Sequence, residues 1–235
     1  MPIPPTTQRA ARTSLQHDRF GTLMTTPELD GPRLAPAAGG APKQLVVFLH
    51  GYGADGNDLI ALGKEWAPLL PNTAFVSPHA PEPCGMAPMG RQWFDLSMGD
   101  MSIIAEGVKR ASPALESFLD TELERQGLTS ESLALVGFSQ GTMMALSVGL
   151  TRPTAPAAIV GYSGALATVE ALPLPGQGPA ILLVLGDIDE VIPVDEMIMA
   201  REVLGQAGLS VQWHVSRGIG HGIDGDVLRL GGDFL

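Results

Sequence analysis

The sequence predicts an α/β protein with a mostly parallel central sheet and helices on both faces. Short runs rich in Leu, Ile and Val alternate with amphipathic runs from residue 44 onward. Most of the short runs are apolar throughout, which is typical of strands buried on both faces of a parallel sheet. Glycine, serine, aspartate and histidine residues follow several of these runs directly. Sites of open α/β sheets lie beyond the carboxyl ends of the strands, so we expect the functional residues there.

Six runs are the expected strands. They cover residues 44–50 (QLVVFLH), 73–77 (TAFVS), 132–137 (SLALVG), 157–162 (AAIVGY), 180–186 (AILLVLG) and 211–216 (VQWHVS). With 235 residues, 45% of them hydrophobic, the chain can bury a large core, and one domain over residues 30–235 is the expected organisation.

Helical patterns lie between these runs. Apolar residues at the i, i+3, i+4 and i+8 positions predict a helix that has Ser112 as its cap and Pro113 at its first position; they are Leu115, Phe118, Leu119 and Leu123. A second helix is predicted over residues 194–206. After the first strand, Asn57 or Asp58 is expected to cap a third helix.

The first 29 residues do not share this pattern. The segment 1–24 holds three arginines and one acid and lacks the apolar core of a secretory signal. We expect residues 1–29 to form a disordered tail, or the native chain to start at Met24. The Arg, Ser and Thr bias also suggests a transit peptide, although the helical periodicity for one is poor.

Charge and cysteine content exclude several classes of function. The net charge of −11 repels nucleic-acid phosphates and anionic lipid surfaces, and no stretch approaches 18 uncharged apolar residues. The single cysteine, Cys84, cannot form an intrachain disulfide, and it is expected to be an inert loop thiol in a reducing cytoplasm. These features favour a small-molecule substrate, with no nucleic-acid partner and no membrane span.

The segment GFSQG (137–141) ends one expected strand and starts a helix. A serine between glycines at −2 and +2 is a weak pattern by itself, because glycine is frequent here. Between a strand and a helix it is typical of a nucleophile elbow, in which a strained turn exposes the serine hydroxyl. Ser139 is therefore the candidate nucleophile.

A serine nucleophile needs a base and an acid that orients it. His221 is the best candidate base of the five histidines, because it lies in the glycine loop GIGHGI after the last strand. The segment GDIDEVIP offers Asp187 and Asp189 as the acid, and spacing alone does not separate them. The order serine, aspartate, histidine is that of α/β-hydrolases.

The first strand ends in the glycine-rich turn FLHGYGADGNDL. Backbone N–H groups of Tyr52 and Gln140 are expected to form an oxyanion hole there. A glycine-rich turn can also bind phosphate, but the chain has no P-loop lysine followed by Ser or Thr.

Six segments resemble, in their order along the chain, the phospholipase/carboxylesterase family of α/β-hydrolases, whose relatives include the acyl-protein thioesterases. They are FLHGYGADGNDL, SPHAPEPC, QWFDLS, GFSQG, GDIDEVIP and GIGHGI. The resemblance covers residues 30–235. It implies Ser139, Asp189 and His221 as the triad, with Asp189 chosen over Asp187, and Tyr52 and Gln140 as oxyanion donors. It also implies an edge strand over residues 30–36 and is compatible with a homodimer. Thr142 departs from the second glycine of many relatives.

The expected activity is hydrolysis of short to medium acyl esters, thioesters or lysophospholipids, without a cofactor or a metal. Trp93 and Phe94, in the methionine-bearing loop 84–101, are the expected substrate contacts. A binding protein that keeps the pocket without catalysis is the alternative from another class. Peptidase or lactonase chemistry on the same triad is the alternative among enzymes.

Overall fold

A computed structural model describes residues 16–17, 23–24, 26–96, 101–167 and 172–235. The main sheet has seven strands in the order β11-β10-β9-β8-β4-β5-β3. Their bounds are β3 Arg33–Leu34, β4 Gln44–Leu49, β5 Thr73–Val76, β8 Leu133–Phe138, β9 Ala158–Tyr162, β10 Ala180–Gly186 and β11 Val211–Ser216. All neighbours pair in parallel except β3, which is antiparallel to β5. The six predicted strands and the edge strand are confirmed.

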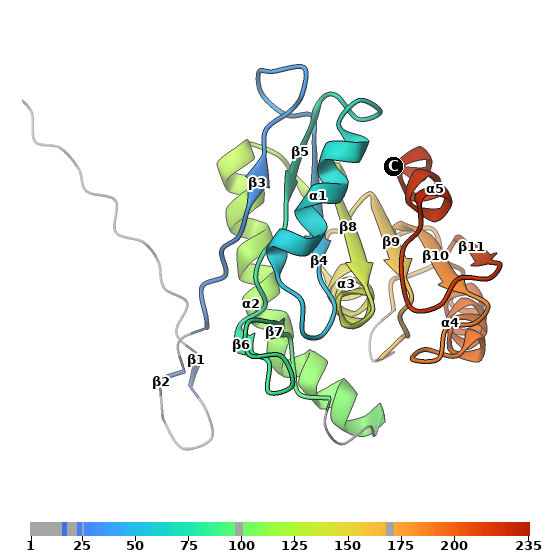
Figure 1. The fold of residues 1–235 in the computed structure, drawn as a ribbon. Helices are drawn as coiled ribbons and strands as arrows, with labels where there is room; N and C mark the ends of the chain where they lie inside the picture. Colours follow the sequence, from blue (N-terminus) through green and yellow to red (C-terminus); the bar gives the residue numbers. More distant parts are fainter. Residues whose placement is uncertain (1–15, 18–22, 25, 97–100, 168–171) are drawn as a thin grey trace, which may run out of the picture.

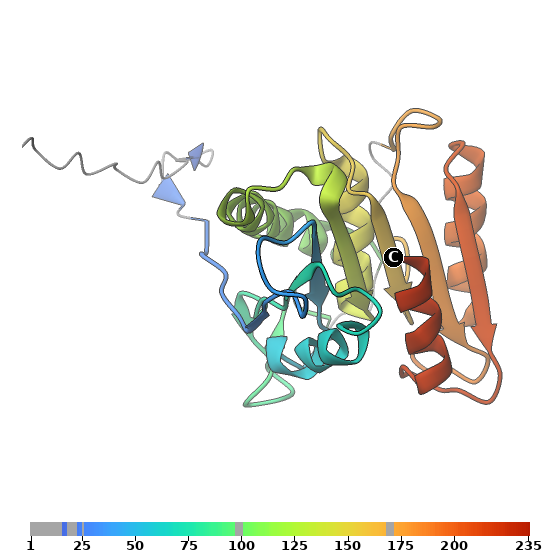
Figure 2. The same cartoon turned by 90° about the horizontal axis from the view of Figure 1, so that it is seen from above.

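Helices cover both faces of this sheet, as predicted (Figures 1 and 2). Their bounds are α1 Gly56–Trp66, α2 Met101–Gln126, α3 Gln140–Thr151, α4 Val194–Gln206 and α5 Gly225–Phe234, and a short 3₁₀ helix spans Ser130–Ser132. One hydrophobic core joins the sheet to α2, α3 and α4, and a second joins it to α1 and α5. Figure 2 shows α1 in cyan and α5 in red on the same side of the sheet.

The register of the parallel strands brings their carboxyl ends to one edge. Leu49 of β4 is level with Gly137 of β8, and Phe138 is level with Tyr162 of β9. Gly186 of β10 is level with Ser216 of β11. Segments that follow these strands therefore meet at the same edge, although they lie far apart in the sequence.

The predicted start of the helix at Ser112 and Pro113 is wrong. Helix α2 begins at Met101, and Pro113 lies inside it. The Ser112 hydroxyl donates to the carbonyl of Val108 instead of capping a helix. Proline is tolerated because it lies on the exposed side, where water can bond the carbonyl that loses its partner. Ile104, Val108 and Ala111 extend the buried stripe toward the N-terminus.

The cap of α1 is Asp55, and neither Asn57 nor Asp58 takes this role. The Asp55 carboxylate accepts from the Asn57 N–H at 2.7 Å, and the Asp58 carboxylate accepts from the Asp55 N–H at 2.8 Å. Asp55 and Asp58 form a capping box, so the cap of α1 lies two residues before the first predicted one.

Two small sheets lie outside the main one. One pairs β1 (Gln16–His17) with β2 (Leu23–Met24), and the other pairs β6 (Glu82–Pro83) with β7 (Arg91–Gln92). Among the described residues, no helix is long and apolar enough to cross a bilayer.

Deleting residues 1–23 should leave the activity and the melting temperature nearly unchanged. The segment lacks the periodic apolar residues that would dock it on the core. Deleting residues 1–30 is the matched comparison, because Leu29 is only 7% exposed and packs in the main core. Loss of a buried leucine costs about 2–5 kcal/mol, so the longer deletion should lower the melting temperature by several degrees. A similar drop with the shorter deletion would show that the tail packs on the domain.

Candidate active site

Ser139 occupies a strained turn between β8 and α3. Its φ of 53° and ψ of −116° are rare for a residue with a side chain, and such conformations cost about 1–3 kcal/mol. A Cβ on Gly137 would overlap the backbone of Gly141 and Thr142, and one on Gly141 would overlap the carbonyl oxygen of Leu49. Both glycines are therefore required for the sharp turn. Ser139 is 8% exposed, so little more than its hydroxyl is accessible.

Thr142 fits beneath this turn because its neighbours are small. Its hydroxyl donates to the carbonyl of Tyr162 at 2.8 Å. A Cβ on Gly161 or Gly164 would overlap the Thr142 side chain. The two glycines of β9 and its following turn thus provide the space that the extra side chain of Thr142 occupies.

The turn after β4 lies directly against the elbow. A Cβ on Gly51 would lie 3.3 Å from Cβ of Ser139, so the two segments are in contact. The backbone N–H groups of Tyr52 and Gln140 have no acceptor among the described residues. The N–H of Gln140 belongs to the first turn of α3, where no intrahelical partner exists. Two free donors therefore flank the serine.

A hairpin holds the turn in place. The N–H of Gly53 donates to the carbonyl of Arg91, and the N–H of Arg91 donates to the carbonyl of Ala54. The neighbouring Cys84 thiol raises the pKa of the Tyr52 hydroxyl to about 12. Cys84 itself is 4% exposed.

Two buried polar side chains that the sequence did not single out support this framework. Nε2 of His50 accepts from the N–H of Ala80 at 3.0 Å, and its Nδ1 lies 2.8 Å from the carbonyl of Gly51. Burial lowers the pKa of His50, which favours the neutral ring that these two bonds require. The Gln140 side chain accepts from the N–H of Trp93 and donates to the carbonyl of Phe94. Both residues lie inside motifs that the sequence analysis named, but the motifs do not indicate these side-chain bonds.

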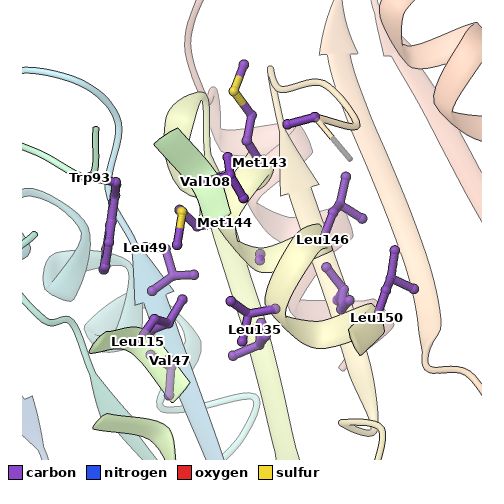
Figure 3. Packing of buried hydrophobic residues seen from close by; sticks show 14 of the residues in the cluster. Val47, Leu49, Trp93, Val108, Leu115, Leu135, Met143, Met144, Leu146 and Leu150 are labelled. Carbon is purple, nitrogen blue, oxygen red and sulfur yellow. The ribbon is translucent and has the colours of Figure 1, made fainter. Parts of the chain in front are cut away.

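Trp93 and Phe94 are not available for the substrate contacts that the sequence analysis assigned to them. Trp93 is 1% exposed, its indole N–H donates to the carbonyl of His50, and Phe94 is fully buried. Figure 3 shows Trp93 among the buried side chains of the main core. The segment QWFDL is apolar because it packs on this core, and its backbone is bound by Gln140. The observed contacts of this segment are with His50, at the turn after β4, and with Gln140 of α3.

Asp189 and His221 form a close pair above the ends of β10 and β11. Nδ1 of His221 lies 3.0 Å from Oδ1 and 2.9 Å from Oδ2 of Asp189. The Asp189 side chain is fully buried, and Oδ1 also accepts from the N–H groups of Val191 and Ile192. Burial disfavours the charge of Asp189, but these backbone bonds and His221 outweigh it and lower its pKa. Asp189 is therefore ionised at neutral pH.

Asp187 has a different environment. Its Oδ1 accepts from the N–H of Gly218, which ties the loop after β10 to the loop after β11. Asp187 is exposed, and no contact between it and His221 is present in the structure. Of the two aspartates that spacing left open, only Asp189 contacts the histidine.

Phe138 links the pair to the elbow. Its ring lies 5.0 Å from that of His221 between centroids, and the residue directly precedes Ser139. The imidazole therefore packs on the residue that precedes the serine, while its Nδ1 contacts Asp189. Sequence reasoning missed Phe138, because an aromatic residue at the end of a buried strand indicates only core packing.

This arrangement brings Ser139, Asp189, His221 and the N–H groups of Tyr52 and Gln140 to the carboxyl edge of the sheet. It can supply a nucleophile, a base with a fixed tautomer and two donors for a developing oxyanion. Among the described residues, no group of three or more His, Cys, Asp or Glu side chains is arranged to bind a metal.

Comparisons with known proteins give a consistent result. The sequence profile of a family described as Phospholipase/Carboxylesterase matches residues 36–235. The chain is 29% identical to Esterase YpfH of Escherichia coli over 82% of each chain. It is 28% identical to Acyl-protein thioesterase 1 of Gibberella zeae over 80% of this chain and 89% of the other. A crystal structure of esterase PE8 is 40% identical with a TM-score of 0.83, over 88% of this chain and 98% of that one.

Proposed function

The chain belongs to the phospholipase/carboxylesterase family of α/β-hydrolases, and on this premise we propose that it hydrolyses carboxylic esters and thioesters through an acyl-enzyme at Ser139. The proposal is carried by one observation. The buried carboxylate of Asp189 contacts Nδ1 of His221, and the His221 ring packs on the residue next to Ser139. Similarity to Esterase YpfH and Acyl-protein thioesterase 1 supports the same class of reaction.

In the proposed first half-reaction, Ser139 Oγ attacks the carbonyl carbon of the ester while Nε2 of His221 accepts its proton. Asp189 keeps the other proton on Nδ1 and stabilises the imidazolium that forms. The oxyanion accepts hydrogen bonds from the N–H groups of Tyr52 and Gln140. Each such donor contributes about 10²–10³-fold in rate.

The tetrahedral intermediate then collapses. The C–O or C–S bond of the leaving group breaks, and His221 returns its proton to the departing alcohol or thiol. Water then attacks the acyl-enzyme while His221 accepts its proton, and the bond from the acyl carbon to Ser139 Oγ breaks as His221 gives that proton to Oγ and the carboxylic acid is released. A proton from water thus replaces the one that left with the alcohol or thiol, so the protein returns to its starting state and no cofactor is required.

The acyl chain is proposed to lie along the hairpin of β6 and β7. This hairpin is bonded to the oxyanion turn through Gly53 and Arg91. Its loop exposes Met86 and Met89, whose side chains are 84% and 92% accessible. Methionine is flexible and polarizable, and it adapts to apolar chains of different length.

The relation of kcat/KM to acyl length should show a maximum at short or medium chains. Each buried methylene adds about 0.8 kcal/mol of binding only until the groove ends. The interval between β9 and β10, residues 163–179, is short for a lipase-type lid. Measuring kcat/KM on a panel of acyl esters and thioesters, from acetyl upward, tests this maximum. A pre-steady-state burst of the released alcohol or thiol would report the acyl-enzyme. Steady growth through long-chain triglycerides, with a jump above their solubility limit, would contradict it, and absence of hydrolysis would support a binding protein.

We also propose a cytoplasmic location and no nucleic-acid partner, supported by the single cysteine and the net charge of −11. A homodimer is the proposed assembly, on the basis of the family. Sedimentation of the purified chain at several concentrations distinguishes a monomer from a dimer.

A further inference from the structure

Ser163 combines two unfavourable features beside the proposed active site. Its φ is 46°, and Ser139 is the other described non-glycine residue with positive φ. Ser163 is 1% exposed, and its buried Oγ has no hydrogen-bond partner among the described residues. An unpaired buried hydroxyl and a positive φ each destabilise a fold, and such features cluster at functional sites.

The sheet register places Ser163 between the nucleophile and the acid. Strand β9 lies between β8 and β10. Phe138 is level with Tyr162, so Ser139 and Ser163 directly follow neighbouring strands, and the N–H of Ser139 donates to the carbonyl of Tyr162 at 2.9 Å. The N–H of Ser163 donates to the carbonyl of Val184 in β10 at 2.8 Å. Ser163 thus follows the strand next to that of Ser139 and is bonded to the strand that leads to Asp189.

Asp189 has unused acceptor capacity on the same edge. A carboxylate offers about four acceptor positions. Oδ1 of Asp189 accepts from two backbone N–H groups and also faces His221. Among the described residues, Oδ2 has His221 as its only hydrogen-bond partner. The N–H of Asp189 bonds the carbonyl of Gly186, which turns the residue back over the end of β10. The Ser163 hydroxyl, a buried donor without an acceptor, therefore follows β9, and the Asp189 carboxylate, a buried acceptor with a free position, follows the adjacent strand β10.

We propose that Ser163 is a positioning residue, whose hydroxyl donates through one buried water to Oδ2 of Asp189. The inference rests on the proposed function, in which Asp189 orients His221. A water is the natural bridge, because buried waters bond polar groups that lack protein partners. The bridge fixes the rotation of the carboxylate, so that the position of Nδ1 of His221 and hence of its Nε2 is defined.

Ser163→Ala and Ser163→Gly test the proposal together. Both remove the hydroxyl, but only glycine also relieves the positive φ. Both should lower kcat on a soluble ester by about tenfold with little change in KM, because the Asp189 carboxylate is no longer held in the orientation that defines the position of Nε2 of His221. Neither should lower the melting temperature. If the backbone conformation alone were important, the two variants would differ in kcat.

The pH profile gives a readout that a structural role would not change. Without its donor, Asp189 becomes more basic and stabilises the imidazolium more, so the acidic limb of kcat/KM should move to higher pH. The downfield proton resonance of His221 Nδ1–H should shift as well. The other ionisable groups in the surrounding loops and the start of α5 are the same in all variants: Asp187, Glu190, Arg217, Asp224 and Asp226.

Ser77→Ala is the matched control. Ser77 is a fully buried serine just after β5, and its hydroxyl donates to the carbonyl of Phe48. Its loss should lower stability slightly while the pH profile and the His221 resonance stay unchanged. Ser163 variants that match wild type in kcat, pH profile and resonance would overturn the proposal. Wild-type protein that neither hydrolyses esters nor reacts with a fluorophosphonate would instead overturn the proposed function, whereas the resonance would still test the bridge.

Discussion

Ser139→Ala should lower kcat for ester hydrolysis on the order of 10⁶-fold, the scale expected for loss of a triad nucleophile. The residue is 8% exposed, and its backbone N–H, which donates to the carbonyl of Tyr162, is kept in the variant. Alanine removes only the oxygen, so the melting temperature and the circular dichroism spectrum should match those of the wild type. Initial rates with a chromogenic short-chain ester measure the effect.

Ser77→Ala controls for loss of a serine hydroxyl at the end of a strand. It should keep nearly full turnover, because Ser77 lies after β5, two strands away from β8. Near-full turnover by a folded Ser139→Ala variant would show that the elbow does not carry the nucleophile.

Asp189→Asn should lower kcat on the order of 10⁴-fold. The asparagine can keep the bonds from Val191 and Ile192 through its carbonyl oxygen. Its amide group would then face Nδ1 of His221 and favour the tautomer with the proton on Nε2, which cannot accept a proton from Ser139. Steady-state kinetics across the pH range, with purified protein of unchanged melting temperature, measures this loss.

Asp187→Asn is the matched control, because it changes a carboxylate only two residues away. Asp187 bonds the N–H of Gly218 and holds two loops together, so this variant should lose mainly stability. A large loss of kcat in Asp187→Asn with little effect in Asp189→Asn would move the acid to Asp187.

Most of the sheet was predictable because its inner strands are buried on both faces. Runs such as 180–186 are apolar throughout, and that pattern depends on local sequence alone. The start of α2 was not predictable by the usual rules, because Ser112 and Pro113 form a good helix start in isolation. Tertiary packing of Ile104 and Val108 extends the helix past it. Local sequence signals therefore predict the existence of a helix or strand more reliably than they predict the residue at which it begins or ends.

The candidate site likewise has a part that the sequence indicates and a part that it does not. Ser139 and His221 follow strands in recognisable glycine turns, and motif and strand order together indicate them. The contact of Asp189 with His221, the burial of Trp93 and Phe94 and the unpaired hydroxyl of Ser163 depend on side-chain packing between strands distant in sequence. No spacing rule contains that information.

Reaction with a fluorophosphonate, followed by proteolysis and mass spectrometry of the peptides, tests the central claim most directly. The reagent forms a stable bond to a serine that a neighbouring base activates. We predict one adduct on the peptide that contains Ser139, no adduct in Ser139→Ala, and greatly slowed labelling in Asp189→Asn. An adduct on another residue, or continued ester hydrolysis by protein fully labelled at Ser139, would contradict the account.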